Sequence, residues 1–337
     1  MNTNIPGHDV IVIGASMGGV EALTKLVAQF PEDLPAAIFI VIHVSPHSKG
    51  IFAQILDRSG PLMAKTAEDR EAIHHGHIYV APPDYHLLVK QGFIRVIRGP
   101  RENRARPAID PLFRSSAASY SSRVVGVILT GYQDDGTSGL LTVKRCGGIA
   151  VIQDPNDAIV PDMPANALEN VEVDYCLPIS EMGAVLDRLA REPAKEPPPV
   201  SEDIIEEMKI TENTIGDTSN RSNLGNLVPY SCPECGGSLR EMEGDKILRY
   251  RCHTGHAYTA RALISDKSDT IENALWHALS ILGERTNMLS NMARHERVRS
   301  RNKSAAIYEN RAEESRAHTQ SIRNLIMALS KSEANSE

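Results

Sequence analysis

The sequence lacks several features that would assign the chain to a specialised class. No apolar run among its 337 residues approaches the roughly 20 that a membrane-spanning helix needs. Residues 1–8 have neither the basic start nor the apolar core of a secretory signal. Basic residues are not in excess, since 36 Lys and Arg accompany 43 Asp and Glu, for a net charge of -7. These absences predict a cytoplasmic protein without membrane insertion, and the charge argues against nucleic acid as a partner.

Cysteine is scarce as well. The chain has five cysteines, too few and too unevenly placed for a disulfide scaffold, and three of them cluster late at Cys232, Cys235 and Cys252. What remains is an ordinary globular composition, with 41% hydrophobic and 23% charged residues. The length is sufficient for two domains that each bury a core.

Residues 9–190 alternate between short apolar runs and amphipathic segments. The runs predict strands at 10–13, 37–42, 78–80, 124–129 and 149–152. Helices are expected at about 20–30, 50–58, 111–120, 137–146 and 180–190, and a β-hairpin over 87–89 and 93–97. The run 124–129 is apolar throughout, as expected for a central strand buried on both faces. The predicted fold class is therefore α/β, with a doubly wound and mostly parallel sheet.

The turn after the first predicted strand has two interpretations. Gly14-x-Ser16-x-Gly18 fits the nucleophile elbow, which exposes a serine between a strand and a helix. A glycine-rich turn at this place is more often a nucleotide or phosphate loop, although here Gly-x-Gly-x-x-Gly is incomplete and no Lys follows. The turn alone leaves both a hydrolase and a nucleotide- or phosphate-binding regulatory protein open.

Two further strand ends carry polar residues suited to catalysis. His43 follows the run 37–42, and Asp134 and Asp135 follow the run 124–129. Because parallel strands share one carboxyl edge, we expect these residues to lie near Ser16, where serine, base and carboxylate can form a triad. A satisfied strand-end histidine and an aspartate at a helix N-cap are the simpler alternatives. The chain order Ser–His–Asp differs from that of the α/β-hydrolases, so a different fold is expected.

Taken together, the motifs resemble the catalytic half of the CheB-type chemotaxis receptor methylesterases. The resemblance covers most of residues 9–190 and rests on six motifs in order: Ile13-Gly14-Ala15-Ser16-Met17-Gly18-Gly19; His43 with Pro46; Tyr79-Val80-Ala81-Pro82-Pro83-Asp84-Tyr85-His86; Arg106-Pro107-Ala108-Ile109-Asp110-Pro111-Leu112-Phe113; Val127-Ile128-Leu129-Thr130-Gly131 with Asp134-Asp135-Gly136; and Met163-Pro164. The family's N-terminal receiver domain is not expected, because the first strand begins near residue 9.

The resemblance implies a Rossmann-like fold and a protein-glutamate methylesterase that also deamidates glutamine. It implies Ser16 as nucleophile, His43 as general base and Asp135 as orienting carboxylate, with Asp134 as the alternative. The amides of Met17 and Tyr132 would form the oxyanion hole, although Tyr132-Gln133 replaces a more usual Met-Gly pair. No cofactor is implied for catalysis. The implied partners are methylated chemoreceptor helices, with a chemotaxis methyltransferase or signalling complex as a further expectation.

The C-terminal third shows a metal-binding pattern. Cys232-x-x-Cys235 before Gly-Gly, followed by Cys252 and His256 (or His253), is typical of a structural zinc ribbon with Cys3His ligands. A redox Cys-x-x-Cys motif is the alternative. Residues 263–331 show apolar helical periodicity with a polar break near 297–303, which predicts a helical hairpin.

These segments give a predicted domain order. We expect a catalytic domain over 1–191, a flexible linker over 192–226, a zinc-ribbon-like module over 227–262 and the helical hairpin over 263–331. Proline and acidic residues mark the linker, in which a short helix near 204–208 is expected. A long linker predicts that hydrolysis of a small ester does not depend on the metal.

Overall fold

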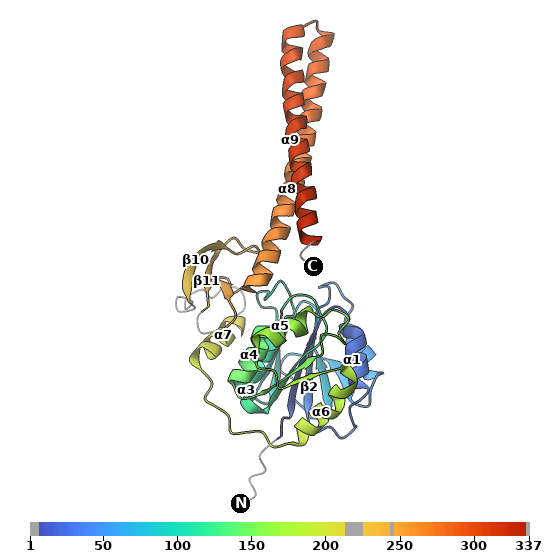
Figure 1. Cartoon of the computed structure of the whole chain (residues 1–337), viewed down its shortest axis with the longest axis vertical. Coiled ribbons are helices and arrows are strands. Elements are labelled where there is room, and N and C mark those ends of the chain that lie inside the picture. The colour runs from blue at the N-terminus through green and yellow to red at the C-terminus, as the bar shows by residue number, and fades with distance from the viewer. Residues whose placement is uncertain (1–6, 213–224, 243–245, 335–337) are drawn as a thin grey trace, which may run out of the picture. The chain divides into compact units, whose positions relative to one another are not determined.

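The computed structural model describes residues 7–212, 225–242 and 246–334 (Figure 1). The chain divides into two compact units, Met1–Leu263 and Ile264–Glu337. The first unit contains both the sheet and the Cys/His segment, which the sequence assigns to separate domains. That division of the chain into a catalytic domain and a zinc ribbon stays a prediction.

A seven-stranded sheet forms the centre of the first unit. Its order is β3 (Met63–Thr66), β4 (His77–Val80), β2 (Ala37–Ile42), β1 (Val10–Ala15), β7 (Val124–Ile128), β8 (Ile149–Gln153) and β9 (Tyr175–Leu177). All six neighbouring pairs are parallel. The predicted doubly wound α/β class is thereby confirmed. The two edge strands, β3 and β9, were not expected.

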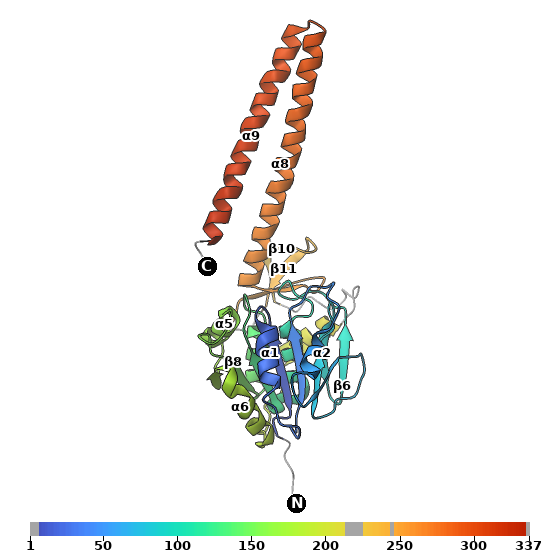
Figure 2. The same cartoon turned by 90° about the vertical axis from the view of Figure 1, so that its right-hand side faces the viewer.

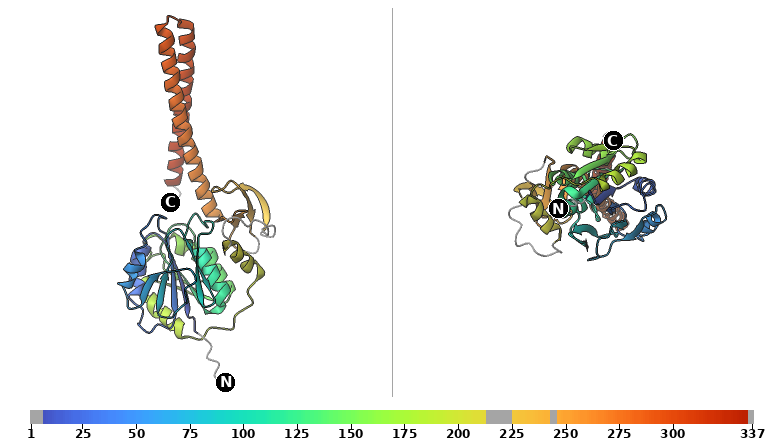
Figure 3. Two further views of the ribbon diagram at one scale, coloured as in Figure 1. Left: turned by 180° about the vertical axis from the view of Figure 1, so that it is seen from behind. Right: turned by 90° about the horizontal axis from the view of Figure 1, so that it is seen from below.

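Helices cover both faces of this sheet (Figures 2 and 3). One face carries α1 (Gly19–Val27), α2 (Phe52–Asp57) and α6 (Ile179–Arg191); the other carries α3 (Ile109–Tyr120), α4 (Thr137–Arg145) and α5 (Asp162–Asn170), with a 3-10 turn at Ser121–Arg123. Side chains alternate along β1, so that Ile11 and Ile13 join the first core and Val10 and Val12 the second. Burial on both faces explains why the central strands are continuous apolar runs.

The remaining elements of the first unit are smaller. The predicted hairpin forms as β5 (His86–Lys90) and β6 (Phe93–Ile97), paired antiparallel. Four antiparallel strands follow later, β10 (Asn226–Ser231), β11 (Ser238–Glu241), β12 (Arg249–Cys252) and β13 (Ala257–Thr259). We call residues 225–242 and 246–259 the Cys/His module.

Within the span expected as linker, α7 (Glu202–Glu212) is a packed helix that buries Ile204 and Met208. Residues 213–224 lie outside the described part of the chain.

Buried charges join the Cys/His module to the sheet region. Glu102, in the loop after β6, accepts hydrogen bonds from Arg114 of α3 at 2.8 Å and from Arg251 of β12 at 3.2 Å. Glu207 of α7 accepts from Arg251 at 2.6 Å and from Arg249 at 2.7 Å. All five residues are at most 8% exposed. Each buried charge therefore has an opposite partner, which burial of ionised groups requires.

This ion cluster makes folding sensitive to acid. Burial alone would raise the pKa of Glu102, but the charges of Arg114 and Arg251 lower it to about 2, and the pKa of Glu207 is likewise lowered. A carboxylate whose pKa falls on folding adds stability above its unfolded pKa, here 4.5, and loses that contribution as the pH drops towards the folded value. We expect the free energy of unfolding, measured by urea titration, to decrease between pH 4.5 and 2. Glu102→Gln should be less stable at neutral pH and show a shallower decrease in that window.

The second unit is a pair of long helices. Helix α8 (Ala260–Val298) begins in the first unit and continues into the second, where α9 (Asn302–Ala334) follows after a short turn. The helices run antiparallel, as the ion pair between Arg297 and Glu309 near the turn and the hydrogen bond from Ser315 Oγ to the Leu282 carbonyl indicate (Figure 1). No helix among the described residues is both long and apolar enough to cross a membrane.

Candidate active site

Ser16 occupies the sharp turn between β1 and α1. Its amide donates to the Thr130 carbonyl at 2.9 Å, and its carbonyl accepts from the Gly19 amide at 2.9 Å. Gly18 has φ +79, a conformation that glycine adopts without strain and that lets the chain enter α1 directly. Gly131 packs against the turn so closely that an added Cβ would lie 2.6 Å from Ser16 Cβ. The carboxyl ends of β1 and β7 therefore meet at Ser16.

His43 extends the neighbouring strand β2 at the same edge. Its amide donates to the Ala15 carbonyl at 3.1 Å, which places it beside the residue that precedes Ser16. Its Nε2 lies 2.8 Å from Asp135 Oδ2, and the side chain is half-buried. Since β2 and β7 flank β1, residues distant in sequence come together at one edge of the sheet.

Asp135 is held by the start of helix α3. The amide of Ile109 donates to its Oδ2 at 2.7 Å, and the Asn103 side-chain amide donates to its Oδ1 at 2.9 Å. Burial alone would raise the pKa of Asp135, but its hydrogen bond and charge interaction with His43, together with these donors, lower it. The positive end of the helix dipole favours the same ionised state. Asp135 is thus a charged carboxylate facing His43.

Asp134, the alternative carboxylate, has a different set of contacts. Its Oδ1 accepts a hydrogen bond at 3.0 Å from Thr259 Oγ1 of the Cys/His module. Burial and the charge of Asp135 raise the pKa of Asp134. Of the two aspartates, Asp135 is the one that contacts His43.

Two polar residues beside Asp135 were not assigned a role from the sequence. Asp110 Oδ2 accepts from the Asn103 side-chain amide at 2.8 Å, and its Oδ1 accepts from the amides of Gly136 and Gly139 at 3.0 and 2.6 Å. Burial and the charge of Asp135 raise the pKa of Asp110 to about 8. Asp110 lies in a motif that carried the resemblance, whereas nothing in the sequence around Asn103 marked it.

Met17 and Tyr132, the residues expected to supply oxyanion-hole amides, lie in two adjoining turns. The Thr130 hydroxyl donates to the Met17 carbonyl at 2.9 Å and ties the two turns together. Met17 and Tyr132 are 55% and 50% exposed, so both turns border solvent. The assignment of their amides to an oxyanion hole stays a prediction.

An open cavity of about 480 Å³ borders His43. Its walls are the segment after β2, the loop after β6 and the turn after β7. The lining residues are His43, Val44, Ser45, Pro46, Arg101, Asn103, Arg104, Ala105, Arg106, Pro107 and Gln133. Arg106 is paired with Asp84 on the β4–β5 connection, and Arg101 with Glu234 of the Cys/His module at 3.3 Å. The cavity thus places His43 beside three arginines, of which Arg101 and Arg106 are paired with carboxylates.

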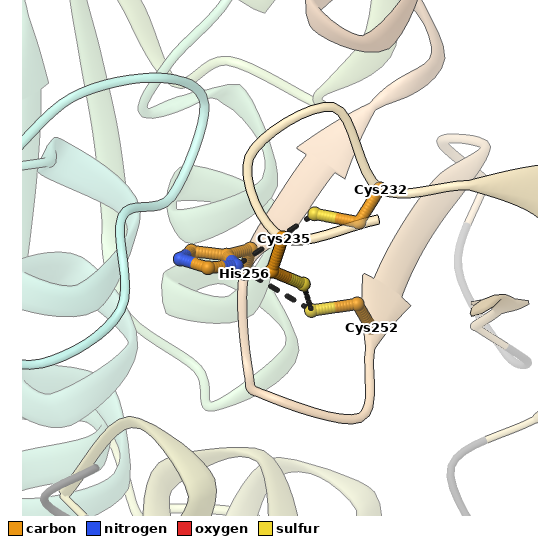
Figure 4. Close-up of side chains that lie close together, drawn as sticks. All are labelled: Cys232, Cys235, Cys252 and His256. Atoms are coloured by element: carbon orange, nitrogen blue, oxygen red, sulfur yellow. Dashed lines mark hydrogen bonds between the residues drawn. The ribbon is translucent and has the colours of Figure 1, made fainter. Parts of the chain in front are cut away.

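The Cys/His module gathers four candidate metal ligands (Figure 4). The ligand atoms of Cys232, Cys235, Cys252 and His256 all lie within 4.8 Å of one another. His256 Nδ1 lies 3.6 Å from Cys232 Sγ and 3.5 Å from Cys252 Sγ, and the sulfurs of Cys235 and Cys252 are 3.7 Å apart. His256, and not His253, belongs to this group.

These distances fit a tetrahedral zinc ion. Zn–S bonds near 2.3 Å and a Zn–N bond near 2.0 Å at the tetrahedral angle separate two sulfurs by about 3.8 Å, and sulfur from nitrogen by about 3.5 Å. A disulfide would need sulfurs roughly 2.05 Å apart. All five cysteines are free thiols. The donor set and its spacing therefore fit a metal better than a redox pair.

A parallel α/β sheet with serine, histidine and aspartate at its carboxyl edge is the architecture of a serine hydrolase, and the chain order sets it apart from the α/β-hydrolases. The model of the CheB methylesterase family matches residues 11–186. The chain belongs to this family, as the sequence resemblance predicts. The match ends before the Cys/His module and the two long helices.

Comparisons with individual proteins agree with this assignment. A relative from Leptospira interrogans, provisionally named protein-glutamate methylesterase/protein-glutamine glutaminase, is 39% identical over 54% of this chain and 95% of its own length. The enzyme of that name from Pyrococcus horikoshii is 36% identical over 53% of this chain and 50% of its own. The crystal structure of the Thermotoga maritima CheB methylesterase catalytic domain superposes with a TM-score of 0.52 and 34% identity, over 54% of this chain and 98% of that one. These relatives favour the hydrolase interpretation of the Ser16 turn over the nucleotide-binding one.

Proposed function

We propose that this chain is a protein-glutamate methylesterase that hydrolyses glutamate methyl esters and deamidates glutamine on chemoreceptors. The observation that carries the proposal is the 2.8 Å contact between His43 Nε2 and Asp135 Oδ2 at the sheet edge where Ser16 lies. The names of the relatives from Leptospira interrogans and Pyrococcus horikoshii supply the substrate class.

The proposed reaction is acyl transfer in two halves. With Nε2 of His43 bonded to Asp135, Nδ1 is the ring nitrogen left to take the proton from Ser16 Oγ as that oxygen attacks the ester carbonyl. The amides of Met17 and Tyr132 stabilise the oxyanion. His43 returns the proton to the methoxy oxygen, methanol leaves, and Asp135 stabilises the imidazolium in the interval. Water then attacks the acyl-enzyme by the same path and releases the glutamate carboxylate. For glutamine, ammonia takes the place of methanol.

The substrate surface in this proposal is a methylated receptor helix in the cytoplasm. Arg101 and Arg104 line the cavity beside His43, so an acidic helix bearing the ester would meet a basic wall. A chemotaxis methyltransferase or signalling complex is proposed as a second partner, on the strength of the shared receptor substrate.

The direct test is release of methanol from methylated receptors of the same cell by the purified chain, with Ser16→Ala as the control. Release by the wild-type chain and none by the variant is the expected result. Thermal stabilisation by a nucleotide, without hydrolysis of any ester, would overturn the proposal.

We also propose that the Cys/His module holds one structural zinc ion. The four ligands would complete a tetrahedron: Cys232, Cys235, Cys252 and His256. This leaves no position for water or substrate, so the metal serves folding and not the chemical step.

We expect about one zinc per chain by elemental analysis, because four protein ligands bind this ion tightly. Cys232→Ser should lose the metal. Cys176→Ser, which removes an exposed thiol on β9, is the matched control and should retain it. Zinc-free protein with Cys232 and Cys235 joined as a disulfide would favour the redox alternative.

A further inference from the structure

The last strand of the Cys/His module pairs with the loop that lines the cavity. The amide of Asn103 donates to the Ala257 carbonyl at 2.8 Å, and the Ala257 amide donates to the Arg101 carbonyl at 3.3 Å. The amide of Thr259 donates to the Asn103 side-chain oxygen at 3.0 Å. Asn103 has φ +48, in the left-handed region that asparagine occupies more readily than most other non-glycine residues. Strand β13 holds it there through hydrogen bonds to both the backbone and the side chain of Asn103.

These contacts continue to the carboxylates beside His43. The Asn103 side-chain nitrogen donates to Asp135 Oδ1 at 2.9 Å and to Asp110 Oδ2 at 2.8 Å. The Thr259 hydroxyl donates to Asp134 Oδ1 at 3.0 Å. Asn103, Thr259, Asp134 and Asp135 are each at most 8% exposed, so water does not replace a lost donor without rearrangement. One residue of the module, Thr259, therefore reaches both aspartates, one directly and one through Asn103.

The orientation of the Asn103 amide depends on Thr259. A flipped amide would turn its oxygen towards the oxygens of Asp135 and Asp110 and its nitrogen towards the Thr259 amide, which is itself a donor. The Thr259 amide therefore selects the orientation in which Asn103 donates to Asp135. A carboxylate that lost this donor would be less well fixed against His43, whose orientation and charge it has to control.

The candidate metal ligands lie on both sides of the turn that leads to Thr259. Cys252 ends β12, His256 precedes β13, and the Cys252 amide donates to the His256 carbonyl at 2.9 Å. A metal bound by these two residues would close the turn and fix the start of β13. The position of Thr259, three residues after His256, would then depend on metal occupancy.

We propose that the Cys/His module positions the active-site carboxylates, with Thr259 and Asn103 as positioning residues, so that turnover at Ser16 requires the metal. This inference rests on the proposed function, and it reverses the expectation that small-ester hydrolysis is independent of the module. The module contributes no residue to the cavity beside His43, but β13 pairs with the loop that lines it. Loss of the metal should therefore change KM as well as kcat, whereas loss of the Thr259 hydroxyl alone should act on kcat.

The first test removes and restores zinc in the full chain. Chelation should lower kcat for a small methyl ester by about 100-fold, a loss within the range caused by a misplaced triad carboxylate. Adding Zn²⁺ should restore kcat in proportion to occupancy, and Cys176→Ser should behave as the wild type. Full turnover in the zinc-free chain would overturn the inference and leave the proposed function intact.

The second test keeps the metal in place and does not depend on refolding. Thr259→Val removes the donor to Asp134 and should lower kcat about 10-fold at unchanged KM and zinc content, the effect of one buried hydrogen bond to a carboxylate. Thr259→Ser keeps the hydroxyl and should retain the wild-type kcat. Because the Thr259 hydroxyl also caps α8 through the Ala262 amide, kcat is measured well below the Tm of each variant.

The outcomes separate the two proposals. Wild-type kcat in zinc-loaded Thr259→Val would contradict a positioning role for this hydroxyl. If the zinc-loaded wild-type chain hydrolyses no methyl ester, the proposed function fails first. Hydrolysis that Ser16→Ala abolishes but that responds to neither zinc nor Thr259→Val would refute the positioning role alone.

Discussion

Ser16→Ala is expected to lower kcat for methyl ester hydrolysis by about 10⁴-fold or more, and His43→Ala by a similar factor. Ser16→Ala removes the attacking oxygen, and His43→Ala removes the group that accepts its proton. Nucleophilic attack and proton transfer depend on each other, so the loss of either group stops both. The double variant should be no slower than the single ones, because the two groups act as a unit. Methanol release under saturating substrate measures all three values.

A matched control is available at the far end of the same sheet. Ser180 is an exposed serine at the start of α6, which follows β9, three strands away from β1 in the sheet order, and Ser180→Ala should keep the wild-type rate. Near-normal turnover by Ser16→Ala would remove the nucleophile assignment. A rise in KM with kcat unchanged in His43→Ala would instead indicate a role in substrate binding.

The central sheet was predictable because its strands are buried on both faces. Strands β1, β2 and β7 are continuous apolar runs. This is the pattern expected of strands that are buried on both faces of a parallel sheet. The edge strands β3 and β9 are four and three residues long and partly exposed, so they carry no comparable signal. Helix α5 was missed as well, since its Met163-Pro164 start gives little periodicity.

The site was predictable where it lies on strand ends and not where it depends on loops. Ser16 and His43 end neighbouring strands, so the topology alone brings them together. Asn103 contacts Asp135, 32 residues away, and Thr259, 156 residues away, through a loop without regular structure. No spacing rule encodes contacts of that kind.

Composition also gave an incomplete account of the expected linker. Its acidic residues are typical of a solvated, mobile segment. Glu207 is nevertheless 4% exposed in α7, where it is the counter-ion of Arg249 and Arg251. Arg249 and Arg251 lie more than 40 residues further along the chain than Glu207. The composition of the linker alone therefore could not predict that this acidic helix is packed.

The two adjacent aspartates should differ sharply when each is replaced by asparagine. Asp135→Asn should lower kcat by about 10³- to 10⁴-fold, because a neutral amide neither holds the required His43 tautomer nor stabilises the imidazolium. The two carboxylate oxygens of Asp135 accept hydrogen bonds from Ile109, Asn103 and His43. An asparagine side chain has only one acceptor oxygen and cannot accept all of them in the same way. Comparing kcat/KM on one methyl ester gives the ratio, with near-UV circular dichroism to verify the fold.

Asp134→Asn is the matched control for Asp135→Asn, because it makes the same replacement at the adjacent residue. Burial raises the pKa of Asp134, and an asparagine oxygen in its place can still accept from Thr259 Oγ1. We expect its kcat to stay within about threefold of the wild type, since the hydrogen bond persists in neutral form. If Asp134→Asn proves the more damaging of the two, the orienting carboxylate is Asp134, and the 2.8 Å contact between His43 and Asp135 is not the one used in catalysis.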